Sequence, residues 1–132
     1  MTKFTVRTNA RCEMIDITDR VEALVRESGL RDGICHVFVP HTTAALTINE
    51  NADPDVPRDI LDSLDRIVPL SDRYRHAEGN AAAHVKASLL GASQTVFVEN
   101  SRLVLGTWQS LFFCEFDGPR TREVWVGLSN TE

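Results

Sequence analysis

Apolar residues occupy neighbouring positions along the segment 108–116 of this 132-residue chain, and this pattern limits the folds that the chain can adopt. Successive side chains of a β-strand point to opposite faces of the sheet. Phe112 and Cys114 therefore fall on one face of this predicted strand. Leu111 and Phe113 fall on the other face. A strand that is apolar on both faces must be covered on both, either by two layers of the same chain or by a second subunit of a homo-oligomer.

Length and composition predict a single globular domain over residues 1–132, since the chain is 42% hydrophobic and 25% charged. The formal net charge of −5 gives no electrostatic support to a nucleic-acid partner. The longest apolar runs are too short to cross a bilayer, so we expect no membrane partner. The first residues lack the apolar core of a signal peptide, and a cytoplasmic location is the default expectation.

The three cysteines, Cys12, Cys35 and Cys114, are odd in number and far apart in sequence. This spacing argues against a disulfide framework and against a thiolate metal cluster. Cys35 and Cys114 lie in apolar runs that resemble strands. We therefore interpret both as small buried hydrophobic residues.

Strands and helices alternate irregularly along the chain, which favours an α+β class. A helix is predicted from a capping box at 19–22 to a stop at Gly29, and another from an N-cap at Asp53 to Ile67. A third helix is predicted over 81–90, ending at Gly91. Strands are predicted over 3–9, 13–17, 33–39, 44–49, 94–98, 102–105, 108–116 and 122–126. The stretch 68–80 shows no periodicity, and an irregular segment of this length is usually functional or disordered.

Three histidines are the main candidates for chemistry: His41 directly after a strand, His76 in the irregular segment, and His84 on the third helix. Imidazole is the commonest zinc ligand, and three imidazoles form an open catalytic site. No two of them form a local ligand motif, so a shared site has to be assembled by the fold. The alternative is that each is a hydrogen-bonded surface or helix residue. We interpret His36, within a strand, as a packed or interface residue.

Acidic residues offer further candidates. The stretch 49–53 can supply a carboxylate ligand or a general base, although Asp53 is also placed to cap a helix. Glu115 lies in the strand that is apolar on both faces. A buried carboxylate needs a partner, so Glu115 is either paired with Arg120 or Arg122 or functional.

Basic and polar residues suggest an anionic ligand. Lys86, Arg75 and Arg102 are candidate anion contacts, and Thr107 and Gln109 are candidate hydrogen-bond donors. The chain carries no P-loop, dinucleotide glycine pattern or serine elbow. The residues by themselves thus predict an α+β domain with a candidate histidine metal site.

Four segments together resemble the YjbQ-like family, also described as secondary thiamine-phosphate synthases. They cover nearly the whole chain in the family's order. Their sequences are HTTAALTINENADP (41–54), YRHAEGN (74–80), AHVKASLLG (83–91) and LGTWQSLFFCEFDGPR (105–120). The chain departs from the family where Gly-His-Ala-His is often found, since residues 81–84 read Ala-Ala-Ala-His. A histidine at position 82 is therefore not an essential ligand here.

The resemblance implies a two-sheet β-sandwich with flanking helices that trimerises around a three-fold axis. It implies zinc or another divalent metal, held by His41, His76 and His84. It also implies an activity on a small phosphorylated metabolite, in which a pyrimidine pyrophosphate joins a thiazole phosphate to give thiamine phosphate and pyrophosphate. Lys86 and Arg75, with the metal, are placed to neutralise the leaving pyrophosphate.

On this basis the candidate catalytic residues are Glu50, Lys86 and Glu115. The candidate substrate-binding residues are Thr42, Thr43, Asn49, Arg75, Asn80, Ser88, Thr107 and Gln109. Two alternatives stay open: a zinc-dependent hydrolase of a small phosphorylated metabolite, and a non-enzymatic trimer that binds a metal or metabolite.

Overall fold

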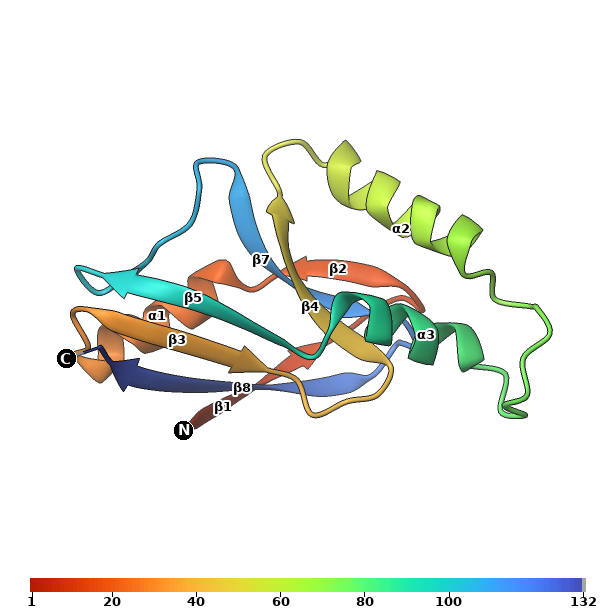
Figure 1. Cartoon of the computed structure of the whole chain (residues 1–132), viewed down its shortest axis with the longest axis horizontal. Helices are drawn as coiled ribbons and strands as arrows, with labels where there is room; N and C mark the ends of the chain where they lie inside the picture. Colours follow the sequence, from red (N-terminus) through yellow and green to blue (C-terminus); the bar gives the residue numbers. More distant parts are fainter. Residues whose placement is uncertain (132) are drawn as a thin grey trace.

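A computed structural model describes residues 1–131, which form a mixed α+β fold with two antiparallel sheets and three helices (Figure 1). The larger sheet has the strand order β1 (Thr2–Arg7), β8 (Thr121–Asn130), β3 (Gly33–Phe38), β5 (Ser93–Glu99) and β6 (Arg102–Leu103). The smaller sheet has the order β2 (Glu13–Asp16), β7 (Gln109–Glu115) and β4 (Ala44–Glu50). The helices are α1 (Thr18–Ser28), α2 (Asp55–Ile67) and α3 (Ala81–Leu90). The predicted fold class and sandwich-like layering are confirmed.

Both faces of β7 are covered within one chain. Leu111 and Phe113 belong to the core that the two sheets share with α1. Phe112 and Cys114 belong to a second cluster, in which α3 contributes Ala83 and α2 contributes partly buried leucines. Of the two explanations for this doubly apolar strand, two layers of the same chain are sufficient, and β7 itself does not require a second subunit.

Several element boundaries differ from the sequence prediction. The capping box is wrong, because α1 begins at Thr18 and Asp19 already lies inside its first turn. Glu22 instead accepts a hydrogen bond from the backbone N–H of Leu103 at 3.3 Å. Trp108 precedes β7 and is 64% exposed, so it does not belong to the buried strand. The helix predicted over 81–90 is confirmed at both ends.

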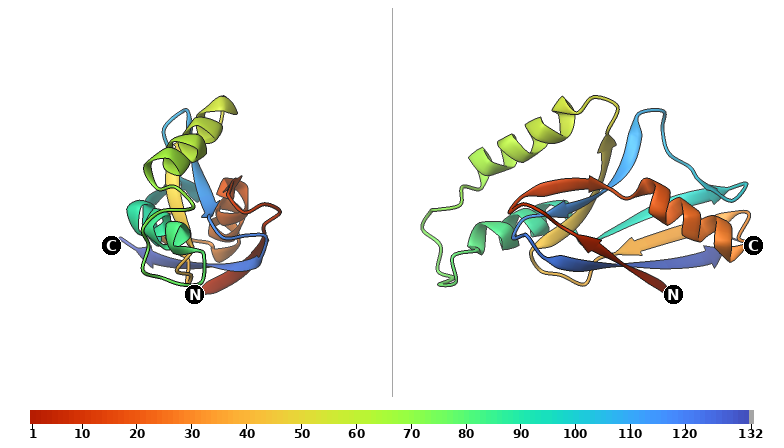
Figure 2. Two further views of the ribbon diagram at one scale, coloured as in Figure 1. Left: turned by 90° about the vertical axis from the view of Figure 1, so that its right-hand side faces the viewer. Right: turned by 180° about the vertical axis from the view of Figure 1, so that it is seen from behind.

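Helix α2 lies at the periphery of the molecule, as the views in Figure 2 show. None of its residues is buried, although its apolar side chains recur at helical spacing. Its carboxylate Asp65 forms an ion pair with the buried Lys86 of α3. None of the helices within residues 1–131 is long and apolar enough to cross a membrane.

The larger sheet carries aromatic side chains on the face opposite the core. In β3, Cys35 and Val37 are buried, whereas Phe38 is 42% exposed. The Phe38 ring lies 5.7 Å from the ring of Trp125 on the adjacent strand β8. Phe97 of β5 is 63% exposed. A single chain therefore leaves an apolar patch on this face.

Candidate functional site

A polar pocket of about 350 Å³ lies beyond the end of β3, beside the start of α3 and the turn between β7 and β8. Its wall combines imidazole, guanidinium, hydroxyl and carboxylate groups. The lining residues are Pro40, His41, Thr42, Thr43, Glu78, Asn80, His84, Asp117, Arg120 and Arg122. His84 also lines two neighbouring hollows, one with His41 and Ser88 and one with Arg75 and His76. The fold thus brings together many of the candidate site residues from the first three family-like segments.

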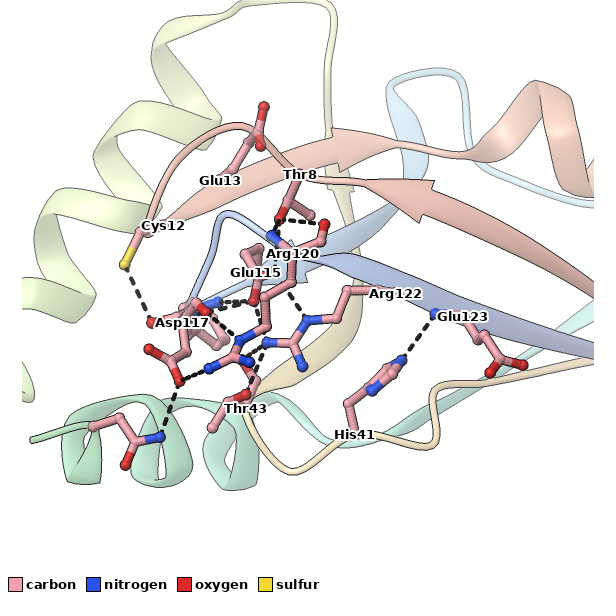
Figure 3. A network of polar contacts seen from close by, with 12 residues as sticks. Thr8, Cys12, Glu13, His41, Thr43, Glu115, Asp117, Arg120, Arg122 and Glu123 are labelled. Atoms are coloured by element: carbon pink, nitrogen blue, oxygen red, sulfur yellow. Dashed lines mark hydrogen bonds and ion pairs between the residues drawn. The ribbon is translucent and has the colours of Figure 1, made fainter. Parts of the chain in front are cut away.

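His41 is fixed by the neighbouring strand β8. Its Nε2 accepts a hydrogen bond of 2.9 Å from the backbone N–H of Glu123 (Figure 3). Because Nε2 provides the lone pair, a neutral ring carries its proton on Nδ1. Burial lowers the pKa of His41, and the nearby charge of Arg122 lowers it further. We therefore infer a neutral imidazole that presents an N–H donor from Nδ1.

His76 and His84 lie side by side, with ring centroids 5.1 Å apart and the rings nearly perpendicular. The Nε2 of His76 lies 2.9 Å from the Oδ1 of Asn80. The Nδ2 of Asn80 in turn donates to the Oδ2 of Asp117 at 2.9 Å. Asn80, a predicted substrate contact, is therefore engaged in holding His76.

The predicted three-histidine metal centre is not assembled within a single chain. Among residues 1–131, no three histidine, cysteine, aspartate or glutamate side chains are grouped as metal ligands. His76 and His84 are adjacent, but the Nε2 of His41 is occupied by the amide of Glu123. The arrangement of one subunit does not fit a metal held by all three histidines, and zinc stays a prediction.

Glu115 has the arginine partner that the sequence predicted, and that partner is Arg122. The Nε of Arg122 donates to Oε1 at 2.9 Å, and its Nη2 donates to Oε2. Thr8 donates to Oε1 at 2.8 Å, and the backbone N–H groups of residues 116 and 117 donate to Oε2 at 3.1 Å. Burial alone would raise the pKa of Glu115, but the hydrogen bonds from Arg122 and Thr8 outweigh it and hold the pKa below its usual range. A carboxylate with this many donors is a structural anchor, which makes it a poor general base.

The pocket contains two arginines, Arg120 and Arg122, that the sequence did not predict as ligand contacts. Arg122 is 6% exposed and donates from Nη2 to the hydroxyl of Thr43 at 2.8 Å. Thr43 is therefore committed to Arg122. Arg120 is more exposed and pairs with Asp117 at 3.0 Å. Both Arg120 and Asp117 belong to the fourth family-like segment, which was the available signal for them.

Lys86 lies outside the pocket, contrary to its predicted contact with a pyrophosphate. Its side chain is 1% exposed and forms an ion pair with Asp65 of α2. Its Nζ lies 5.9 Å from the ring centroid of Phe116. Lys86 and His84 are two residues apart on a helix, so they do not share a face. The lysine joins α3 to α2.

Four other predicted site residues lie at the far end of the smaller sheet. In the antiparallel pair β4–β7, Glu50 is opposite Gln109, whereas Ala44 is opposite Glu115 near the pocket. The six-residue separation along β4 corresponds to about 20 Å. The four residues away from the His41 pocket are Asn49, Glu50, Thr107 and Gln109.

Comparison with known proteins agrees with this architecture. A model of the YjbQ-like UPF0047 proteins matches residues 2–131. The UPF0047 protein YugU of Bacillus subtilis is 56% identical over 124 residues, covering 93% of this chain and 94% of that protein.

Two solved structures extend the comparison to three dimensions. An uncharacterised YjbQ/UPF0047 protein from Clostridium acetobutylicum superposes with a TM-score of 0.96 at 53% identity, covering 98% of this chain and all of that one. The conserved hypothetical protein TT1486 from Thermus thermophilus gives a TM-score of 0.92 at 44% identity, with coverage of 98% and 100%. The fold and pocket define an α+β domain with a polar site at one end of its sheets. The chain belongs to the YjbQ-like UPF0047 family.

Proposed function

We propose that the His41 pocket binds a small phosphorylated metabolite, and that the chain is a transferase that forms thiamine phosphate. The observation that carries this proposal is the convergence of His41, Arg120 and Arg122 on one pocket of about 350 Å³. Fixed N–H donors and guanidinium groups are the usual ligands of phosphate oxygens. The bonds of Arg122 to Glu115 and Thr43 use Nε and Nη2, and Nη1 lies outside these contacts.

The proposed reaction places modest demands on the protein. The thiazole nitrogen attacks the methylene carbon of the pyrimidine pyrophosphate, so a C–N bond forms while the C–O bond to pyrophosphate breaks. The bonding electrons leave with pyrophosphate, and no proton is transferred. The protein has to align the two substrates and stabilise the charge that develops on the leaving group. His41 and Arg120 can supply this stabilisation, and no protein nucleophile is required.

Purified protein incubated with both precursors tests the proposal, with thiamine phosphate measured by chromatography. We expect turnover in the wild type and a loss of about 100-fold in kcat/KM for His41→Ala and for Arg120→Ala. Arg58→Ala is the matched control for Arg120→Ala, because Arg58 is an exposed arginine of α2 that lies outside the pocket lining and pairs with the exposed Asp55. The absence of product from folded wild-type protein, with and without added divalent metal, would contradict the transferase.

Zinc is a separate proposal, supported by the adjacent rings of His76 and His84. A third ligand requires either that His41 release the amide of Glu123 or that another subunit contribute a side chain. Elemental analysis of untagged protein tests this directly, with a His41/His76/His84 triple alanine variant alongside. We expect near-stoichiometric zinc in the wild type and none in the variant. If the wild-type protein still contained no metal after reconstitution with zinc, the proposal of a zinc site would be contradicted.

We also propose a homotrimer, supported by the aromatic patch on the larger sheet, where Phe38 and Phe97 are exposed and Trp125 is half-buried. Sedimentation analysis of the wild type and of Phe97→Asp tests it. We expect a trimer for the wild type and dissociation for the variant. A monomeric wild type would contradict the proposal.

A further inference from the structure

We propose that Asp117, acting through the side chain of Asn80, fixes His76 in the tautomer that carries its proton on Nε2. Asp117 and Asn80 are then positioning residues for His76. The functional meaning of this inference rests on the function proposed above. The tautomer itself is a property of the folded protein and is measurable without any activity.

The chain of hydrogen bonds starts at Asp117. Its Oδ2 receives two donors, the Nδ2 of Asn80 at 2.9 Å and the Nη2 of Arg120 at 3.0 Å. Burial alone would raise the pKa of Asp117, but the hydrogen bonds from Asn80 and Arg120 outweigh it and lower the pKa. An ionised carboxylate can only accept hydrogen bonds. The atom of Asn80 that faces Asp117 must therefore be the amide nitrogen.

The orientation of Asn80 then determines which nitrogen of His76 carries the proton, and the more distant carboxylate of Glu78, whose Oε2 lies 3.7 Å from Nε2, favours the same nitrogen. With its nitrogen toward Asp117, Asn80 presents its carbonyl Oδ1 to the Nε2 of His76 at 2.9 Å. A carbonyl oxygen can only accept, so Nε2 must carry the proton. In a neutral ring, Nδ1 is then left with a free lone pair. The partner of one ring nitrogen thereby defines the role of the other.

His41 holds the opposite tautomer. Its Nε2 faces the backbone N–H of Glu123, which can only donate, so its proton lies on Nδ1. The two histidines therefore offer complementary groups at the same end of the fold, a donor at His41 and an acceptor at His76. The acceptor suits an N–H or O–H of a bound metabolite, or a metal ion. Outer partners that fix a tautomer in this way typically affect metal affinity or activity by 10–100-fold.

Long-range ¹H–¹⁵N correlation spectra of uniformly labelled protein test the inference at about pH 8.5, where imidazoles are ordinarily neutral. Single His→Gln variants assign the four histidines. We expect the Nε2–H pattern for His76 and the Nδ1–H pattern for His41. An Nδ1–H pattern for His76 in the wild type would overturn the proposal.

Two substitutions at position 117 separate a positioning role from a structural one. Asp117→Ala removes the acceptor, so we expect His76 to change to a mixture of tautomers. Asp117→Asn can place its own oxygen where Oδ2 lies and should preserve the wild-type pattern. The signal of His41 should stay constant in both variants and serves as the internal check on folding. An unchanged His76 signal in Asp117→Ala would refute the relay.

A second variant covers the case in which Asp117→Ala does not fold. Asn80→Ala removes the link itself while leaving Asp117 paired with Arg120. We again expect a mixture of His76 tautomers, and an unchanged signal would again refute the relay. Because the readout is spectroscopic, a failure of thiamine phosphate formation and a failure of the relay are distinguishable.

Discussion

The guanidinium of Arg122 and the carboxylate of Glu115 form a buried two-point ion pair that ties the larger sheet to the smaller one. Arg122 belongs to β8, and Glu115 is the last residue of β7. The same guanidinium lines the His41 pocket (Figure 3). Arg122 therefore lines the candidate site and, through this ion pair, also connects the two sheets. We expect substitutions in the pair to lower the free energy of unfolding, whatever their effect on activity.

Glu115→Gln should lower the free energy of unfolding by about 3 kcal/mol, because it leaves the buried charge of Arg122 without its counter-ion. Urea denaturation measures this change. Asp55→Asn is the matched control, since Asp55 pairs with Arg58 at an exposed position of α2 and should change stability by less than about 0.5 kcal/mol. Equal changes in the free energy of unfolding for the two substitutions would show that the buried ion pair contributes no more to stability than the exposed one.

Acid should destabilise the protein through its paired carboxylates. The pKa values of Glu115, Asp117 and Asp16 are lowered in the fold, so the folded state binds protons less readily than the unfolded chain. Their contribution is fully present above the unfolded pKa values of about 4 and is lost as the pH falls through the folded values. Thermal melts from about pH 7 to pH 2 should show this loss. Glu115→Gln should show a shallower loss, and an identical slope would contradict the assignment.

Lys86 should prove structural rather than catalytic. Lys86→Met keeps an unbranched side chain in the buried site and leaves Asp65, which is 44% exposed, to water and to Arg11 at 3.9 Å. We expect a change in stability within about 1 kcal/mol and unchanged turnover in the thiamine phosphate assay. Lys86→Ala should cost about 2–3 kcal/mol because it leaves a cavity. A folded Lys86→Met variant without turnover would restore the catalytic role predicted from sequence.

The cysteines should be poorly reactive in the native protein. Burial raises the pKa of Cys35 to about 11 and that of Cys114 to about 12. Cys12 is less buried, so a thiol reagent at about pH 8 should modify Cys12 first and reach the other two only on unfolding. Cys12→Ser should abolish the early reaction. Rapid modification of two or more thiols in the native wild type would contradict this picture.

The sequence predicted most of the elements because their signals are local. Helix α3 follows from helix-forming residues that end at Gly91, and β4 follows from alternation that begins at Ala44. The pairing of Glu115 with an arginine was also predictable, because a buried carboxylate needs a counter-ion. The predicted capping box of α1 is wrong, because the carboxylate of Glu22 accepts a hydrogen bond from the backbone N–H of Leu103, which is distant in sequence.

The candidate site was predictable only in part. His41, Asn80 and His84 do line one pocket, whereas Lys86 turns to Asp65 and Glu50 lies at the far end of β4. Two residues of one motif can face opposite sides of a helix, or can lie six positions apart on a strand. Which of them reach the same pocket depends on how the helices and sheets pack.

The family, the α+β class and the residue types available for chemistry follow from the sequence, because motifs and hydrophobic periodicity are properties of the chain. Which of those residues meet, and which protonation state each adopts, depends on the tertiary fold. His41 is a donor at Nδ1 because β8 brings the amide of Glu123 to its Nε2. Glu115 is an anchor because Arg122 and Thr8 converge on it from other strands and loops. Hydrogen-bond partners distant in sequence fix protonation and orientation, and folding alone supplies them.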